Sequence, residues 1–190
     1  MTALDLGPAT RATADLVRGV RDDQLGAATP CPAYDVGDLL DHLHGLARAF
    51  TAAADKDLGE MTDSAPEPDG SALPTDWRDA IPGALDRLAE AWRTPGATDG
   101  VTRAGGVDLP GEVALLVALD EVVVHGWDLA RATDQAYDPD AASVEASLGF
   151  ARSFSPEGEG PFGPPVAVVA DAPALDRLAG ATGRDPRWTP

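Results

Sequence analysis

Cysteine is nearly absent from this chain, and its scarcity limits the covalent chemistry available. Cys31 is the only cysteine in 190 residues, so no internal disulfide can form, and this usage is typical of a reducing compartment such as the cytoplasm. Because Cys31 stands between two prolines, we expect a small buried packing residue rather than a nucleophile.

Basic residues and long apolar runs are also missing. The chain has 14 Lys and Arg against 32 Asp and Glu, which gives a formal net charge of −18 at pH 7. Nucleic acid and anionic membranes carry charge of the same sign, so neither is expected as a partner. No apolar run approaches the roughly 18 residues of a membrane span, and no leader pattern opens the chain. We therefore expect a cytoplasmic protein.

Motifs of nucleotide and redox chemistry are absent as well. The sequence contains no glycine-rich phosphate loop, no CxxC pair and no GxSxG elbow. Its apolar content is 44% with only 5% aromatic residues, which favours a core of Ala, Leu and Val. The length suits one domain over residues 1–190.

Helical periodicity accounts for most of what is present. Apolar residues recur at helical spacing over residues 3–22, 36–56, 75–94 and 112–132, and shorter helices are predicted over 138–153 and 172–181. Asp35 with Asp38 makes a capping box for the second helix, and Asp138 is expected to cap the fifth. The Gly-rich stretch 100–111 predicts a short extended segment. The fold class predicted is all-α, a helical bundle with additional C-terminal helices.

Two connecting features carry further expectations. Residues 57–74 form a long acidic loop with three prolines, and a loop of this kind is either mobile or placed over a functional mouth. Pro82 and Gly83 lie inside the third helix and predict a kink there.

A carboxylate and an imidazole lie at helical spacing in the most apolar helix. Glu121 and His125 are four residues apart in the run Leu115–Ala132, where side chains at this spacing have Cβ atoms roughly 5–6 Å apart. A buried carboxylate needs a partner, a solvated cavity or a cation. The spacing permits chelation of a metal ion, and it equally permits a Glu121–His125 hydrogen bond without metal.

The second helix supplies the remaining histidines. His42 and His44 flank its apolar stripe on opposite sides, so periodicity alone does not choose between them, although Ala49 and Ala53 extend the apolar face towards His42. Either histidine could instead be a solvated surface residue.

Four motifs in order carry a resemblance to a known family. They are TPCPAYDV at Thr29–Val36, LLDHL at Leu39–Leu43, VHGWDLARA at Val124–Ala132, and FGPP at Phe162–Pro165. Together they resemble the actinobacterial metal-binding proteins of the DinB-like superfamily, near the N-terminal domain of mycothiol-dependent maleylpyruvate isomerase.

The resemblance implies an antiparallel four-helix bundle that holds a divalent metal ion, zinc most often and nickel as the alternative. Carried over residue by residue, the ligands would be His42, Glu121 and His125. Many members have HxxxH on the late helix, whereas this chain has Glu121 in the first position, as the isomerase does. The isomerase also has a further C-terminal domain, so isomerase activity does not follow from the resemblance.

Two more residues are candidates for cofactor binding. Asp128 either accepts a hydrogen bond from a ligand and orients it or is a polar residue at the cavity rim. Arg131 is placed to bind a substrate carboxylate by two hydrogen bonds, with a surface ion pair as the alternative role.

These residues lead to two functional hypotheses. In the first, three protein ligands leave a fourth position open, and a small thiol such as mycothiol attacks an electrophilic substrate there in S-transfer or thiol-assisted isomerisation. In the second, the bundle is a non-catalytic metal- or ligand-binding module that serves as a sensor or partner protein. The oligomeric state is left open, a homodimer included.

Overall fold

The computed structural model describes residues 4–154 and 161–190, and these residues are mainly helical. The helices are α1 (Gly7–Gly19), α2 (Val36–Asp55), α3 (Trp77–Arg93), α4 (Gly111–Thr133), α5 (Ala141–Ala151) and α6 (Ala174–Ala181). Two strands, β1 (Val101–Ala104) and β2 (Val107–Pro110), lie between α3 and α4, and single 3₁₀ turns occur at Asp22–Gln24 and Gly70–Ala72. The predicted all-α class is confirmed.

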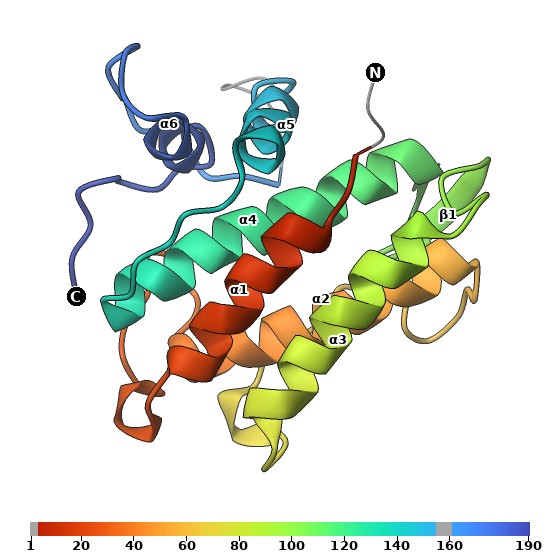
Figure 1. Cartoon of the computed structure of the whole chain (residues 1–190), viewed down its shortest axis with the longest axis horizontal. Coiled ribbons are helices and arrows are strands. Elements are labelled where there is room, and N and C mark those ends of the chain that lie inside the picture. The colour runs from red at the N-terminus through yellow and green to blue at the C-terminus, as the bar shows by residue number, and fades with distance from the viewer. Residues whose placement is uncertain (1–3, 155–160) are drawn as a thin grey trace.

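Four helices form the bundle. α1 and α2 each pack against both α3 and α4. Following the colours of Figure 1, α1 and α4 run in one direction and α2 and α3 in the other. The long connection between α2 and α3 returns the chain to the end where α2 began, which allows these two neighbours to run parallel. The antiparallel contacts are therefore α1 with α3 and α2 with α4.

The core lies where these four helices meet. Its largest fully buried side chains come from every bundle helix and include Val17, Leu40, Leu85 and Leu119. Helix α4 is the most enclosed element, because α1, α2, α5, α6 and the hairpin all contact it. This enclosure explains why its sequence is apolar on nearly every face. None of the helices among the described residues is long and apolar enough to cross a membrane.

Local sequence signals set the start of α2 as expected. The side chain of Asp35 accepts a hydrogen bond from the backbone N–H of Asp38 at 2.9 Å, and Asp38 accepts one from the N–H of Asp35 at 3.3 Å. This capping box satisfies two of the backbone donors that a helix start leaves free. The helix that carries His42 thus begins at a fixed residue.

The extended segment is a tight hairpin. Val101 pairs with Pro110 and Ala104 with Val107 in an antiparallel register. The turn residues Gly105 and Gly106 both have positive φ, 57° and 79°, which a two-residue type I′ turn requires and glycine adopts at low cost.

Several predicted boundaries were wrong. Helix α1 ends at Gly19 because the next residue turns to extended backbone, so residues 20–22 do not continue it, and Asp22 opens a separate 3₁₀ turn. Asp140, not Asp138, caps α5, since its side chain accepts from the N–H of Ser143 at 3.1 Å. Helix α6 begins at Ala174 rather than at residue 172. Helix α3, predicted over residues 75–94, begins at Trp77 and continues through Pro82 to Arg93.

The acidic loop 57–74 packs beside α2 and the hairpin. The N–H of Gly70 donates to Asp38 at 2.9 Å, and the N–H of Gly106 donates to the carbonyl of Thr62 at 2.8 Å. None of the loop's residues lines the pocket described below. The expectation that it covers a functional mouth was therefore wrong for this pocket.

Candidate metal centre

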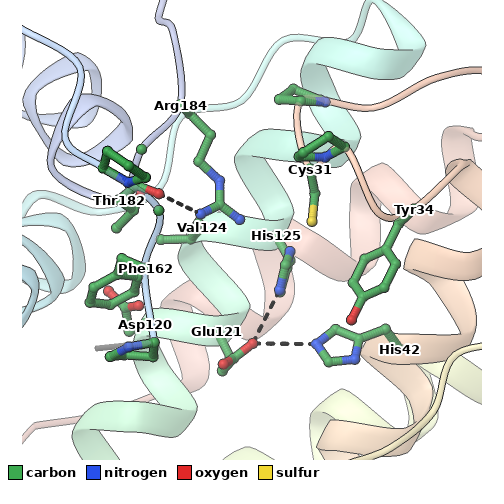
Figure 2. Close-up of a pocket in the computed structure, with 16 residues that line it drawn as sticks. Cys31, Tyr34, His42, Asp120, Glu121, Val124, His125, Phe162, Thr182 and Arg184 are labelled. Atoms are coloured by element: carbon green, nitrogen blue, oxygen red, sulfur yellow. Dashed lines mark hydrogen bonds and ion pairs between the residues drawn. The ribbon is translucent and has the colours of Figure 1, made fainter. Parts of the chain in front are cut away.

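Three side chains from two helices meet at one pocket (Figure 2). One carboxylate oxygen of Glu121, Oε2, lies 3.4 Å from Nε2 of His42 and 3.1 Å from Nε2 of His125. One ligand atom from each of the three residues lies within 4.8 Å of the other two. Three tetrahedral ligands around an ion at about 2.1 Å would be about 3.4 Å apart. The two distances from Glu121 are close to this value, and the three residues together could hold a divalent metal ion.

The structure distinguishes the two histidines of α2. The contact between α2 and α4 places His42 beside Glu121, and the ring centroids of His42 and His125 are 4.8 Å apart. His44 is absent from this cluster. Burial and the neighbouring Arg48 guanidinium lower the pKa of His44 instead.

Electrostatics bind the three side chains together without metal. Burial by itself raises the pKa of Glu121, but hydrogen bonds from His125 and His42 outweigh it and hold that pKa well below its usual range. Burial by itself lowers the pKa of His125, yet hydrogen bonds to Asp128 and Glu121 raise it to about 9. Glu121 therefore stays ionised, and its carboxylate is a ready ligand for a cation.

Asp128 lies directly behind His125. Its carboxylate is fully buried and Oδ2 accepts a hydrogen bond from Nδ1 of His125 at 3.0 Å. This contact leaves Nε2 of the same ring directed at Glu121. Of the two positions the sequence suggested for Asp128, a buried acceptor behind His125 agrees with the geometry, and the cavity rim does not.

Arg184 completes this arrangement from the segment after α6. Its Nε donates to Oδ1 of Asp128 at 3.1 Å and its Nη2 to Oδ2 at 2.8 Å. The guanidinium side chain is only 12% exposed. A buried carboxylate that lacked this cation would be strongly destabilising. The pair thus explains how Asp128 is tolerated inside the protein.

The pocket itself has a volume of about 490 Å³, within the range of small-molecule sites. Its walls combine the three clustered side chains with apolar and polar groups from α4, from the connector before α2 and from the C-terminal segment. Besides the cluster they include Pro30, Cys31, Tyr34, Asp120, Val124, Pro161, Phe162, Thr182, Gly183 and Arg184.

Asp120 is a second carboxyl group on the pocket wall. It is 3% exposed, and its Oδ1 has no hydrogen-bond partner among the described residues. Burial, followed by the neighbouring charge of Glu121, raises the pKa of Asp120 to about 8. Its carboxyl group is therefore largely neutral at pH 7, unlike that of Glu121.

The position of Cys31 differs from the one expected. Its side chain is half-buried and lines the pocket (Figure 2). It is therefore not the buried packing residue that its flanking prolines suggested. Burial and the charge of Asp128 raise the pKa of its thiol, so the thiolate form is disfavoured.

Tyr34, three residues further, places its ring 5.3 Å from that of His42 and 6.3 Å from that of His125. Its hydroxyl points towards His42 in Figure 2. This brings a polar group of the connector to the open side of the cluster.

Arg131 does not line the pocket. Its Nη2 donates to the backbone carbonyls of Pro186 at 3.0 Å and Trp188 at 2.6 Å, and its guanidinium lies 5.7 Å from the ring of Trp127. These contacts differ from both roles considered for it, the substrate clamp in this pocket and the surface ion pair. Its contacts tie the C-terminal end of the chain to α4.

Comparison with known families places most of the chain in one of them. The family model of the mycothiol maleylpyruvate isomerase N-terminal domain matches residues 6–130. The chain belongs to this family. The matched region contains His42, Glu121 and His125, and it ends before the segment that supplies Arg184.

Two relatives and two solved structures match the chain. Two uncharacterised proteins of Mycobacterium tuberculosis, from strains CDC 1551 / Oshkosh and ATCC 25618 / H37Rv, are each 32% identical over 181 residues, which is 93% of either chain. A crystal structure of mycothiol-dependent maleylpyruvate isomerase matches with a TM-score of 0.55 at 22% identity, over 75% of this chain and 65% of that one. A point mutant of that enzyme matches with a TM-score of 0.55 at 21% identity over 77% and 65%. This likeness shows the shared fold, and the chain spans less than two thirds of the solved isomerase.

Sequence reasoning missed three groups at this site. Asp120 was overlooked beside Glu121, Tyr34 was noted only as part of a motif, and Arg184 was not considered. The one available signal for Arg184 was indirect, because a buried Asp128 requires a cation. Nothing in the spacing shows which of the arginines supplies it.

Proposed function

We propose that this protein is a divalent-metal-binding, thiol-dependent enzyme of the S-transferase or isomerase type, with mycothiol as the thiol and zinc as the metal. The observation that carries the proposal is the convergence of His42, Glu121 and His125 on one wall of a pocket of about 490 Å³. Membership of the family of the mycothiol maleylpyruvate isomerase N-terminal domain supports the choice of thiol. In this proposal the three residues are the metal ligands.

The charges of the pocket suit an anionic sulfur. Asp128 and Arg184 neutralise each other, and Asp120 is largely uncharged at neutral pH, which leaves Glu121 as the one net negative group among these residues. Metal binding requires neutral imidazoles, so His125 would give up its extra proton. A dication there would then leave a single net positive charge and would lower the pKa of a thiol from about 8.5, so that the thiolate prevails at neutral pH.

The chain's own residues would orient the reactants. Tyr34 and His42 bound one side of the open space and Phe162 the other, so an electrophile can approach the sulfur only along the pocket. The thiol proton passes to solvent, the sulfur lone pair forms the bond to carbon, and a leaving group such as chloride departs with its bonding electrons. In the isomerase-like case the sulfur adds to a conjugated double bond and is later eliminated, so the thiol is regenerated.

The first test is metal content by plasma mass spectrometry on untagged protein. We expect about one zinc per chain in the wild type and loss of zinc in His42→Ala and in Glu121→Ala. His44→Ala is the matched control, because it removes a histidine from the same helix outside the cluster, and it should retain zinc. A metal-free wild type after reconstitution with zinc would refute the proposal.

The second test measures turnover of an electrophilic probe such as monochlorobimane with mycothiol. Thiol-dependent conjugation that disappears in zinc-depleted protein and returns when zinc is added supports the enzyme. Zinc bound by the wild type without any thiol-dependent turnover would exclude the enzyme for this substrate class and favour the non-catalytic binding module.

A further inference from the structure

Arg184 lies outside the matched family domain but reaches into its centre. The residue follows α6, and its backbone N–H donates to the carbonyl of Ala179 at 2.8 Å, which fixes it to the end of that helix. From there the side chain extends to Asp128 on α4. The ion pair thus joins a segment late in the chain to the helix that carries two of the three clustered residues.

Both oxygens of Asp128 and all three guanidinium nitrogens of Arg184 take part in hydrogen bonds. Each oxygen of Asp128 accepts one guanidinium hydrogen bond, and Oδ2 also accepts from Nδ1 of His125. The Nη1 of Arg184 donates to the carbonyl of Thr182 at 2.9 Å. A two-pronged contact fixes the plane of a carboxylate as well as its position. The plane of Asp128 in turn decides where its Oδ2 meets the imidazole.

We propose that Arg184 is a positioning residue for His125: by holding the carboxylate of Asp128, it keeps Nδ1 of His125 hydrogen-bonded and Nε2 directed at Glu121 and His42. The segment after α6 is then part of the candidate metal centre. The proposal rests on the proposed function in so far as metal affinity is its readout, but the orientation of His125 can be measured without metal.

The backbone around Arg184 is built to keep it in place. Gly183 has a φ of +83°, and a Cβ there would come within 3.0–3.1 Å of the backbone of Gly163. Residues 163 and 183 therefore lie against each other, and both line the pocket. A single tight junction thus sets the pocket wall and the direction in which the Arg184 side chain leaves the backbone.

The experiment compares zinc affinity, by competition with a chromophoric chelator, in the wild type, Arg184→Gln and Arg131→Gln. Arg131 is the matched control, because it also ties the C-terminal end to α4 but makes no contact with Asp128. Loss of a partner behind a ligating histidine typically weakens metal binding about 10–100-fold. We expect a loss of this size in Arg184→Gln and at most about a twofold change in Arg131→Gln. Equal losses of zinc affinity in both variants would overturn the proposal, since any loosening of the C-terminal segment would then have the same effect.

Two further variants separate geometry from charge and from loss of structure. Arg184→Lys keeps the charge without the two-pronged contact, so its zinc affinity should fall between those of the wild type and Arg184→Gln. A zinc affinity equal to that of the wild type would overturn the proposed positioning role of Arg184. Adding Arg184→Gln to Asp128→Asn should cost little beyond Asp128→Asn alone, because both act through one contact. Helical circular dichroism identifies any variant that has not folded.

A nuclear magnetic resonance measurement tests the orientation directly. The Nδ1 proton of His125, held against Asp128, should give a resolved low-field signal in the metal-free wild type and in Arg131→Gln. It should be lost to exchange in Arg184→Gln. Persistence of the signal in Arg184→Gln would overturn the proposal even if zinc binds. If the wild type binds no zinc, the proposed function fails, and this signal still decides the role of Arg184.

Discussion

Replacing Gly126 by alanine should destabilise this protein, although alanine is the better helix former. Gly126 follows His125 in the middle of α4, where a glycine lowers helix stability by about 1 kcal/mol relative to alanine. The structure explains why it is there. A Cβ at Gly126 would lie 2.5 Å from the hydroxyl oxygen of Tyr137 and 2.7 Å from Oγ1 of Thr13, closer than non-bonded atoms approach.

The magnitude follows from what those two hydroxyls do. Thr13 donates to the carbonyl of Val122 at 3.2 Å, and Tyr137 donates to that of Val123 at 3.3 Å, so both are anchored to α4 itself. Overpacking typically costs about 1–3 kcal/mol, and each neutral hydrogen bond that is displaced costs about 0.5–1.5 kcal/mol. After the helix-propensity gain, we expect a net loss of roughly 2–3 kcal/mol. This corresponds to a fall in Tm of about 5–10 °C for a chain of this size.

The assay is urea unfolding and calorimetry of Gly126→Ala beside Gly83→Ala. Gly83 lies inside α3, and a Cβ there would meet only the Arg87 side chain, at 3.6 Å. That control should gain about 0.5–1 kcal/mol. If Gly126→Ala were as stable as the wild type, the close approach of α1 and Tyr137 to α4 beside His125 would be wrong, and with it the reason for the glycine.

Three other perturbations follow from the contacts. Asp35→Ala removes the cap of α2 and should lower the free energy of unfolding by about 1 kcal/mol in urea, without a change in the slope of the transition. Thr102→Val removes a buried hydroxyl that donates to the carbonyl of Ala53 at 2.6 Å, and a loss of about 1 kcal/mol is expected by the same measurement; an unchanged midpoint would contradict this contact. Cys31 of the metal-free protein should react with iodoacetamide at neutral pH more slowly than free cysteine, because burial raises its pKa. Faster alkylation, followed by mass spectrometry, would show an activated thiol instead.

Local patterns in the sequence were enough to predict which segments are helical. The start of α2 follows from the Asp35–Asp38 capping box, and the apolar character of α4 indicated a helix enclosed on most sides. The predicted start of a helix was wrong where two possible capping residues lay close together, as with Asp138 and Asp140 before α5. Either aspartate can cap a helix, and only the packing of α5 against α4 and α6 selects one of them.

The candidate centre was determined by the sequence only in part. Glu121 and His125 share a face of α4 because of the 3.6-residue period of the helix, which is a local property. The choice of His42 over His44 depends on how α2 packs against α4, and the partner of Asp128 depends on where the chain returns after α6. Both contacts join residues more than fifty positions apart. Periodicity carries no information over such separations. The resemblance pointed to His42, but only the tertiary structure shows that this histidine meets Glu121 and that Arg184 stands behind Asp128.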